Sequence, residues 1–273
     1  MSHCDRSIVY KTDARCVPSP DSDLVKENHM TARKTTQASK KPRKAPSKKL
    51  APPAPAKTVH YYLLLDRSGS MESMRDDVVG GFNAFLNEQR QIAGRARVTL
   101  VQFDSQDPQE TLLNAVAIGR VENLHPSQFC PRGGTPLLDA TARLISTIHG
   151  RQAYRKALSK VEEEVVFITV TDGEENQSRH ATLDQVKALI NNAKELGWNF
   201  VFLGAGIDAY GDAERLGYDV DSVQAWQPDG KGARNAWHSV SRAGAQLRHD
   251  VTAGVTFNKA DYFRGLKEAE LES

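Results

Sequence analysis

Residues 59–71 read VHYYLLLDRSGSM, a run of apolar and aromatic side chains that stops abruptly at Asp66. The run does not alternate with polar residues, which is typical of a strand covered on both faces inside a parallel sheet. In such sheets ligands gather at the carboxyl ends of the strands, and Asp66, Ser68 and Ser70 lie at or just beyond this end. We therefore expect a buried strand that ends in an oxygen-rich loop.

The loop after the strand offers only oxygen donors. Carboxylate and hydroxyl oxygens without His or Cys favour Mg²⁺, Mn²⁺ or Ca²⁺ over zinc or copper. Alternate residues of an extended strand lie about 6.6 Å apart, whereas Mg²⁺ holds its oxygens at roughly 2.0 to 2.1 Å. The loop must therefore curl to surround an ion, and Gly69 would permit the curl. The alternative is a strand followed by a simple helix cap, a common position for Ser, Asp and Gly.

Charge divides the chain of 273 residues into unlike parts. Residues 1–57 carry 13 Lys and Arg against 5 Asp and Glu, a net charge of +8, whereas the remainder carries 23 against 29, a net charge of −6. This pattern predicts a basic tail over 1–57 and an acidic domain over 58–250. A C-terminal extension over 251–273 shows no clear pattern.

The second half of the tail has a composition typical of disorder. No acidic residue occurs in 30–57, where prolines alternate with Lys, Arg and Ala, so too little apolar surface is available for folding. The tail is either a solubilising linker or a polyanion-binding segment, with a nuclear targeting signal as a variant. Residues 30–57 contain no aromatic residue, so nucleic acid would be bound weakly through phosphates alone. The basic residues concerned are Lys40, Lys41, Arg43, Lys44, Lys48 and Lys49.

Cellular location can be inferred from what the sequence lacks. It shows no secretory signal and no apolar run of 18 residues, so no membrane association is expected. Cys4, Cys16 and Cys130 have neither zinc-site spacing nor the pattern of a disulfide framework. We expect a cytoplasmic protein in a reducing compartment, or a nuclear one if the source is eukaryotic.

Strand and helix patterns alternate along the acidic domain. The short turn over 104–109 predicts that the strand at 110–118 is an antiparallel edge strand. The alternation predicts an α/β fold with a Rossmann-like, open, mostly parallel sheet and helices on both faces. Strands are expected at 59–65, 97–103, 110–118, 165–171, 198–203 and 222–226, and helices at 75–91, 136–148, 182–196 and 233–247.

Two further loops offer oxygen ligands in the same way. Thr135 lies in a Gly-Gly-Thr-Pro turn before a helix, and Asp172 follows a strand in a Thr-Asp-Gly sequence. Together with the D-x-S-x-S loop, this pattern resembles the von Willebrand factor A domain with its metal-ion-dependent adhesion site. The resemblance covers residues 58 to about 250. It implies that Ser68 and Ser70 bind Mg²⁺, or Mn²⁺ or Ca²⁺, directly. It also implies that Asp66 and Asp172 hold the ion largely through water, and that Thr135 does so directly or through water.

The resemblance implies a binding function. The two carboxylates only just balance a divalent ion, so an open position on it would accept a Glu or Asp from a partner protein. Intracellular members of the family often act in multiprotein assemblies, some driven by ring ATPases, which implies an adaptor or assembly factor. Residues that we expect on the rim of the partner site, or as plain surface, are Arg67, Met71, Glu174 and Asp208.

Two other functional classes are less well supported by the sequence. A metal-dependent hydrolase is disfavoured because residue 68 is Ser where an aspartate phosphotransferase has a second carboxylate. The sequence also lacks a nucleophile elbow and a phosphate-binding P-loop. We therefore predict that the chain is not an enzyme. A nucleic-acid-associated factor, tethered by the basic tail, is the other alternative and is compatible with protein binding.

Overall fold

The computed structural model describes residues 57–172, 175–206, 208–227, 229–255 and 257–267. The expected basic tail, with its six Lys and Arg residues, and Glu174 lie outside the described residues. The described part contains a six-stranded sheet in the order β3-β2-β1-β4-β5-β6. Its strands are β1 (Thr58–Asp66), β2 (Ala96–Phe103), β3 (Glu110–Ala117), β4 (Glu163–Thr171), β5 (Asn199–Ala205) and β6 (Val223–Trp226).

The direction of the strands confirms the predicted fold class. β1 pairs in parallel with β2 on one side and with β4 on the other, and β5 and β6 continue the parallel sheet. β3 runs antiparallel to β2 at the edge, as the short turn before it predicted. The strand order reverses between β1 and β4, and in open α/β sheets this switch point forms a crevice where ligands bind.

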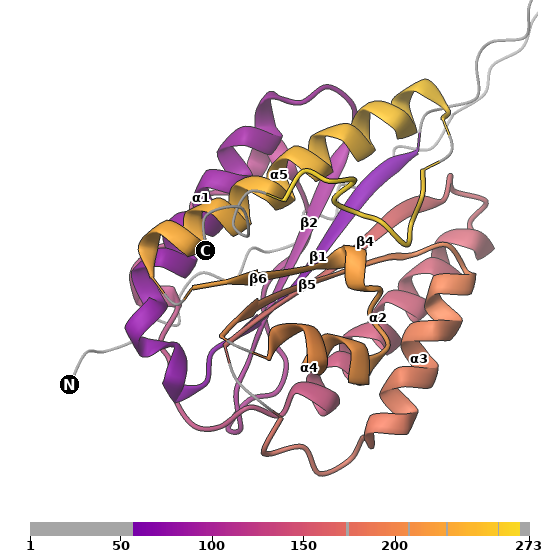
Figure 1. The fold of residues 1–273 in the computed structure, drawn as a ribbon. Coiled ribbons are helices and arrows are strands. Elements are labelled where there is room, and N and C mark those ends of the chain that lie inside the picture. Colours follow the sequence, from indigo (N-terminus) through magenta and orange to yellow (C-terminus); the bar gives the residue numbers. More distant parts are fainter. Residues whose placement is uncertain (1–56, 173–174, 207, 228, 256, 268–273) are drawn as a thin grey trace, which may run out of the picture. The chain divides into compact units, whose positions relative to one another are not determined.

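Helices cover both faces of the sheet, as Figure 1 shows. One face packs on α1 and α5, whereas the other packs on α2, α3 and α4 (Figure 1). Successive residues of β1 enter opposite cores, because Tyr61 and Leu63 face α1 and α5 while Tyr62 and Leu64 face the other layer. The helices are α1 (Arg75–Gln91), α2 (Leu137–Ala157), α3 (Leu183–Glu195), α4 (Ala209–Leu216) and α5 (Gly230–Ala253).

The carboxyl-terminal part of the fold extends beyond the predicted elements. The short helix α4, after β5, has no counterpart among the predictions. Helix α5 crosses position 250, where the sequence suggested the end of the domain. Phe257, Tyr262 and Phe263 then bury their side chains in the core on the α1 and α5 face. Residues 257–267 therefore pack on the sheet as part of the same compact unit.

Two findings bear on the expected cellular location. Among the described residues, no helix combines the length and apolar character that crossing a bilayer requires. Cys130 is disulfide-bonded, which corrects the expectation that the cysteines form no disulfide, while Cys4 and Cys16 lie outside the described residues. The cysteines therefore no longer support a reducing compartment, and the cytoplasmic location stays a prediction.

Candidate functional site

Asp66 ends β1 at the switch point, where its carboxylate is held from two sides. The side chain is completely buried. Its Oδ1 accepts a hydrogen bond from the Ser68 backbone N–H at 2.7 Å, and its Oδ2 accepts one from the Thr171 hydroxyl at 2.6 Å. Because Thr171 is the last residue of β4, the two neighbouring strands jointly orient the carboxylate.

Hydroxyl groups connect this carboxylate region to Asp172. The Ser68 and Ser70 hydroxyl oxygens lie 3.0 Å apart, and the Ser70 hydroxyl donates to Asp172 Oδ1 at 2.9 Å. Ser68 is buried and Asp172 is half-buried, whereas Ser70 is exposed. The structure thus brings four predicted ligands together in a cluster that opens to solvent on the Ser70 side.

The loop containing Thr135 is joined to the cluster through its backbone. The Gly69 N–H donates to the Gly133 carbonyl at 3.0 Å, and the Arg132 N–H donates to the Arg67 carbonyl at 2.8 Å. Gly133 has a φ of 66°, and an added Cβ would lie 2.5 Å from the Ser105 hydroxyl, so this turn requires glycine. Gly69 has no such positive φ, which corrects the expectation that its left-handed freedom curls the loop.

The segment after Asp172 fixes the start of α2. The Asn176 side chain accepts the Thr135 N–H at 2.9 Å, and Glu175 accepts the Leu138 N–H at 2.8 Å. Pro136, at the N-cap of α2, offers no capping side chain, so Glu175 supplies the cap from a distant loop. The N-cap of α2 is thus Pro136 and not the preceding Thr135. The sequence showed Glu175 and Asn176 only as polar loop residues.

A third contact ties the same segment to α2 from the other direction. The Asp139 carboxylate, buried in the first turn of the helix, accepts three backbone N–H groups, from Arg179, His180 and Ala181. Burial alone would raise the pKa of Asp139, but these hydrogen bonds hold it below its ordinary value. The segments that carry Thr135 and Asp172 are thus fixed relative to each other.

The electrostatic state of the cluster follows from its burial. Burial raises the pKa of Asp66 to about 7, against the opposing effect of its hydrogen bonds from Thr171 and Ser68. Burial also raises the pKa of Asp172. Neither carboxylate forms an ion pair with a Lys, Arg or His of the described part, so the negative charge of the cluster has no fixed counterion there.

The predicted rim residues do not all lie on the surface. Arg67 is buried, and its guanidinium contacts the Asp104 carboxylate, with Nε at 2.8 Å, as well as Glu110. Met71 is completely buried in the core below α1. Neither side chain offers a surface to a partner in this structure, contrary to the prediction. Asp208 is exposed just before α4, beyond the end of β5.

Asp104 binds two arginines of the loops that form the site. Its carboxylate is buried between Arg67 and Arg132, whose Nε lies 2.9 Å away, and it also accepts the Gln106 N–H at 2.7 Å. Burial would raise the pKa of Asp104, but these partners lower it below the ordinary value. The Arg67 to Asp104 pair therefore anchors the loop after β1 to the end of β2. The only sequence signal for this pairing is the position of Asp104 at the end of a predicted strand.

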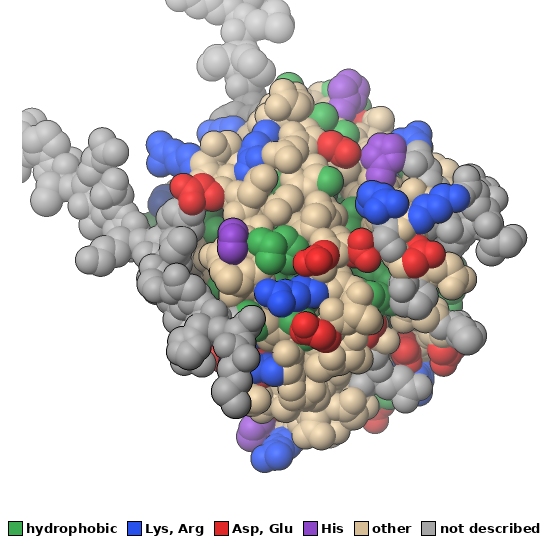
Figure 2. Space-filling model, turned by 90° about the vertical axis from the view of Figure 1, so that its left-hand side faces the viewer, with side chains coloured by type: hydrophobic (Ala, Val, Ile, Leu, Met, Phe, Trp, Pro, Cys, Tyr) green, Lys and Arg blue, Asp and Glu red, His purple; other side chains and the backbone are tan. Residues whose placement is uncertain are grey.

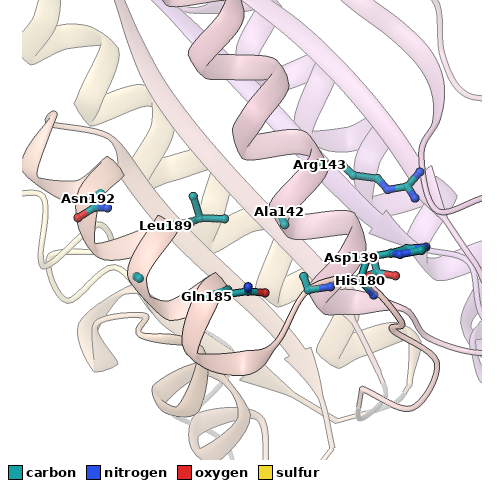
Figure 3. A pocket seen from close by; sticks show the side chains of 9 residues that line it. Asp139, Ala142, Arg143, His180, Gln185, Leu189 and Asn192 are labelled. Atoms are coloured by element: carbon teal, nitrogen blue, oxygen red, sulfur yellow. Dashed lines mark hydrogen bonds between the residues drawn. The ribbon is translucent and has the colours of Figure 1, made fainter.

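One face of the surface and one cavity formed by described residues lie away from this cluster. Figure 2 shows the side that holds α1 and the first turns of α5, where Asp and Glu side chains form a band and hydrophobic side chains appear only in small patches. A cavity of about 480 Å³ lies between α2 and α3, with Leu189 in its middle and Asp139, Arg143 and His180 at one end (Figure 3). Asp139 is saturated by backbone N–H groups, so this cavity has no free carboxylate for chemistry.

The residues present fit a hard divalent cation. In the part of the chain that the structure describes, no three His, Cys, Asp or Glu side chains group as a metal site. The cluster at the end of β1 instead combines two carboxylates with Ser hydroxyls, a donor set that suits Mg²⁺ better than zinc. A buried carboxylate without a fixed counterion is the feature that a bound cation would satisfy.

Comparisons with known proteins show the fold. No family model matches the sequence, and no curated protein matches it. The pilus adhesin SpaC from Lactobacillus rhamnosus GG is similar in structure, with 14% identity and a TM-score of 0.55 over 70% of this chain and 30% of the adhesin. A von Willebrand factor type A protein from Catenulispora acidiphila gives 12% identity and a TM-score of 0.44 over 69% of this chain and 43% of that protein.

The matched region covers 30% of the SpaC adhesin and 43% of the Catenulispora protein, and the sequence identities are low. The matches therefore speak for the arrangement of strands and helices and not for an activity. The comparisons show an α/β fold shared with the SpaC adhesin.

Proposed function

We propose that this chain is a divalent-cation-dependent protein-binding module of the von Willebrand factor A type. The observation that carries the proposal is the Asp66 carboxylate, which is completely buried at the switch point of the sheet without a described cationic partner. A buried carboxylate in this state is costly unless another group compensates its charge. The residues that would hold the cation are Asp66, Ser68, Ser70, Thr135 and Asp172.

Mg²⁺ is the cation that this donor set fits best, with Mn²⁺ and Ca²⁺ as the other hard ions of the same class. When bound, the ion supplies an electrophilic position that a Glu or Asp side chain of a partner protein can occupy. The protein residues supply the rest of the site. Thr171 and the Ser68 N–H fix the orientation of the Asp66 carboxylate, and the exposed Ser70 marks the side from which a partner carboxylate approaches.

The role of adaptor or assembly factor, including an ATPase-driven assembly, belongs to this proposal as an inference from the family resemblance. The name of SpaC, a pilus adhesin, agrees with a binding function for the shared fold. Two predictions from the sequence stay predictions: that the chain is not an enzyme, and that the basic tail can contact nucleic acid. The basic residues of the tail that would contact nucleic acid lie outside the described part of the structure.

The cation is tested by thermal unfolding of the full chain with 10 mM Mg²⁺ or with EDTA. A site with a hundredfold excess of ion over its Kd would stabilise the wild type by about 2.7 kcal/mol, which corresponds to roughly 5 to 10 °C for a domain of this size. Asp66→Asn keeps the shape of the side chain and one of its two acceptor oxygens but removes its charge, so this shift should disappear. Equal shifts in the wild type and in Asp66→Asn would refute the assignment.

Asp250→Asn is the matched control for a buried carboxylate. Asp250 is 5% exposed on α5 and pairs with Arg264 at 2.9 Å, so it belongs to a different part of the core. This variant should be less stable than the wild type because Arg264 loses its partner, yet it should keep the full Mg²⁺ shift. In EDTA the stability of Asp66→Asn should stay close to that of the wild type, because the variant removes an uncompensated buried charge but also loses one of two hydrogen-bond acceptors.

The partner is tested by affinity capture from the native lysate with the wild type and Asp66→Asn, each in Mg²⁺ and in EDTA. We expect proteins that the wild type retains only in Mg²⁺. Replacing the acidic residues in the contact segments of these proteins by Ala or Asn should abolish their capture. If every captured protein is indifferent to both Mg²⁺ and Asp66, binding does not use this site.

A further inference from the structure

A second pocket lies at the opposite end of the sheet from Asp66. It has a volume of about 670 Å³ and is formed by the start of β1, the turn before β2, the end of β3 and the turn between α2 and β4. Four cationic residues line it, Arg95, Arg97, Arg155 and Lys160, and its lining contains no Asp or Glu. We call it the basic pocket. Its volume falls in the range of small-ligand sites, about 300 to 1,000 Å³.

Two cations of the basic pocket, Arg97 and Arg155, share one buried carboxylate with Arg151. Behind the pocket, the completely buried carboxylate of Glu163 accepts a bidentate pair from Arg151 at 2.9 Å and also lies 3.3 Å from Arg155 and 3.9 Å from Arg97. Among the described residues, three guanidinium groups thus share one carboxylate, which balances one of their three positive charges. The Arg155 Nε is buried without a hydrogen-bond partner in the structure. An anion in the pocket would complete this cluster.

The turn between α2 and β4 shapes the mouth of the pocket. The Ser159 N–H donates to the Lys156 carbonyl at 2.9 Å, and the Lys160 N–H donates to the Arg155 carbonyl at 3.0 Å, the paired bonds of a Schellman helix end. Ser159 holds a φ of 51°, a conformation that glycine adopts without strain at this position. The chain thus keeps a hydroxyl group at the pocket lining where glycine would fit more easily, which is typical of functional positions.

The lining selects the kind of anion. Arginine forks and a hydroxyl group match the oxygens of a phosphate, and several converging cations favour a multiply charged group over a single carboxylate. The pocket lining includes no aromatic side chain on which a base or sugar ring could stack. The basic segment over 1–57, with its net charge of +8, joins the fold next to Thr58, which itself lines the pocket.

We propose that the basic pocket binds a phosphate group, through Arg97, Arg155, Ser159 and Lys160. The phosphate belongs either to a free phosphate compound or to the phosphodiester backbone of a nucleic acid. This site is separate from the proposed cation site and does not depend on it.

The test uses the full chain in EDTA, which keeps the cation site out of the measurement. Inorganic pyrophosphate is titrated by calorimetry, and a fluorescent 20-nucleotide oligothymidine is titrated by anisotropy, both at low salt. Lys160→Glu is the main variant, because the exposed Lys160 side chain makes no hydrogen bond or ion pair with another described residue. Reversal of one contacting charge should weaken binding by about tenfold or more.

Two further variants separate the pocket from general charge and from folding. Lys187→Glu makes the same change on the exposed face of α3 and should leave both affinities within twofold of the wild type. Ser159→Gly preserves the turn but removes the hydroxyl group, and should weaken phosphate binding a few-fold while the protein unfolds at an equal or higher temperature. All variants are compared only if they unfold as cooperatively as the wild type.

The two probes distinguish the source of the phosphate. Loss of pyrophosphate binding in Lys160→Glu identifies a site for free phosphate compounds, and loss of oligonucleotide binding with no measurable pyrophosphate binding identifies a site for phosphodiesters. Either result supports the pocket. If Lys160→Glu and Lys187→Glu affect each probe equally, or if neither probe binds the wild type, the proposal is wrong.

Discussion

The buried residue His60 should make the fold less stable in mild acid than a variant that lacks this histidine. His60 of β1 is completely buried, with Nδ1 3.1 Å from Glu163 Oε2, Nε2 2.9 Å from the Thr99 hydroxyl, and its ring stacked on Tyr62. Burial lowers the pKa of His60 from 6.5 to about 4; Glu163 opposes this shift, whereas the charges on α2 and β2, at Arg151 and Arg97, add to it. The ring is therefore neutral in the folded protein.

The direction and size of the effect follow from linkage. Between pH 6.5 and pH 4 the unfolded chain takes up a proton at His60 that the folded chain refuses, so stability falls as the pH falls. From pH 7 to pH 5 this one group costs about 2 kcal/mol. The pKa of Glu163 is also lowered from its ordinary value of 4.5, mainly by its hydrogen bonds from His60 and Arg151 in opposition to burial. Its contribution is therefore lost at lower pH. Asp66, whose pKa is raised to about 7, takes up a proton in the folded protein within the interval from 7 to 5 and opposes the effect of His60, so the effect is measured against a variant that lacks His60.

The assay is urea unfolding in EDTA at pH 7 and pH 5, followed by the fluorescence of the buried residues Trp198, Trp226 and Trp237. His60→Gln removes the titrating group and keeps a polar side chain beside Glu163 and Thr99. Carboxylates that titrate in this interval contribute equally to both proteins, so the comparison cancels them. The wild type should lose about 2 kcal/mol more than His60→Gln between the two pH values. Equal losses in the two proteins would show that His60 is not held neutral by burial.

Three further predictions concern stability and are checked by thermal unfolding. In Gly81→Ala the new Cβ would lie 1.9 Å from Trp237 Cδ1 and force α1 away from α5, which should cost about 3 kcal/mol of stability. The control Gly80→Ala meets no atom within 4 Å and should stabilise the fold. Ser159→Gly should stabilise by about 1 kcal/mol, because it relieves the φ of 51°. Thr182→Ala removes a capping box from α3 and should cost about 1 kcal/mol.

The parts of the fold that the sequence predicted correctly depend on local signals. The bounds of α1 were predicted, since amphipathic spacing acts within a few positions of the chain. The antiparallel direction of β3 followed from the length of the turn before it. Helix α4 escaped prediction because it has only 8 residues, about two turns, between glycine-containing loops.

The parts that the sequence could not predict depend on distant partners. Arg67 looked like a surface residue beside the loop, but Asp104 and Glu110, about 40 positions away, draw its guanidinium into the protein. Likewise, Glu175 caps α2 across 37 positions. A charged residue next to a ligand loop reads the same in sequence whether it faces solvent or a buried carboxylate, so only the fold separates the two cases.

β1 and β4 connect the two proposed sites and also keep them apart. β1 carries His60 near its start and Asp66 at its end, and β4 carries Glu163 and Thr171 in the corresponding positions. The 9 residues of β1 span about 26 Å, more than two Debye lengths, each about 8 to 10 Å at physiological salt. Direct electrostatic coupling between a cation at one end and a phosphate at the other is therefore negligible.

Any coupling between the sites would have to pass through the strands themselves. Both strands are buried along their whole length and packed between two helical layers, an environment that resists small displacements. Asp66→Asn should therefore leave pyrophosphate affinity in EDTA unchanged, and Lys160→Glu should leave the stabilisation by Mg²⁺ unchanged, so that the double variant shows the sum of the two effects. A departure from additivity larger than about 0.5 kcal/mol would mean that the two ends of β1 and β4 move together. Binding at the cation site would then regulate binding at the basic pocket, and the reverse.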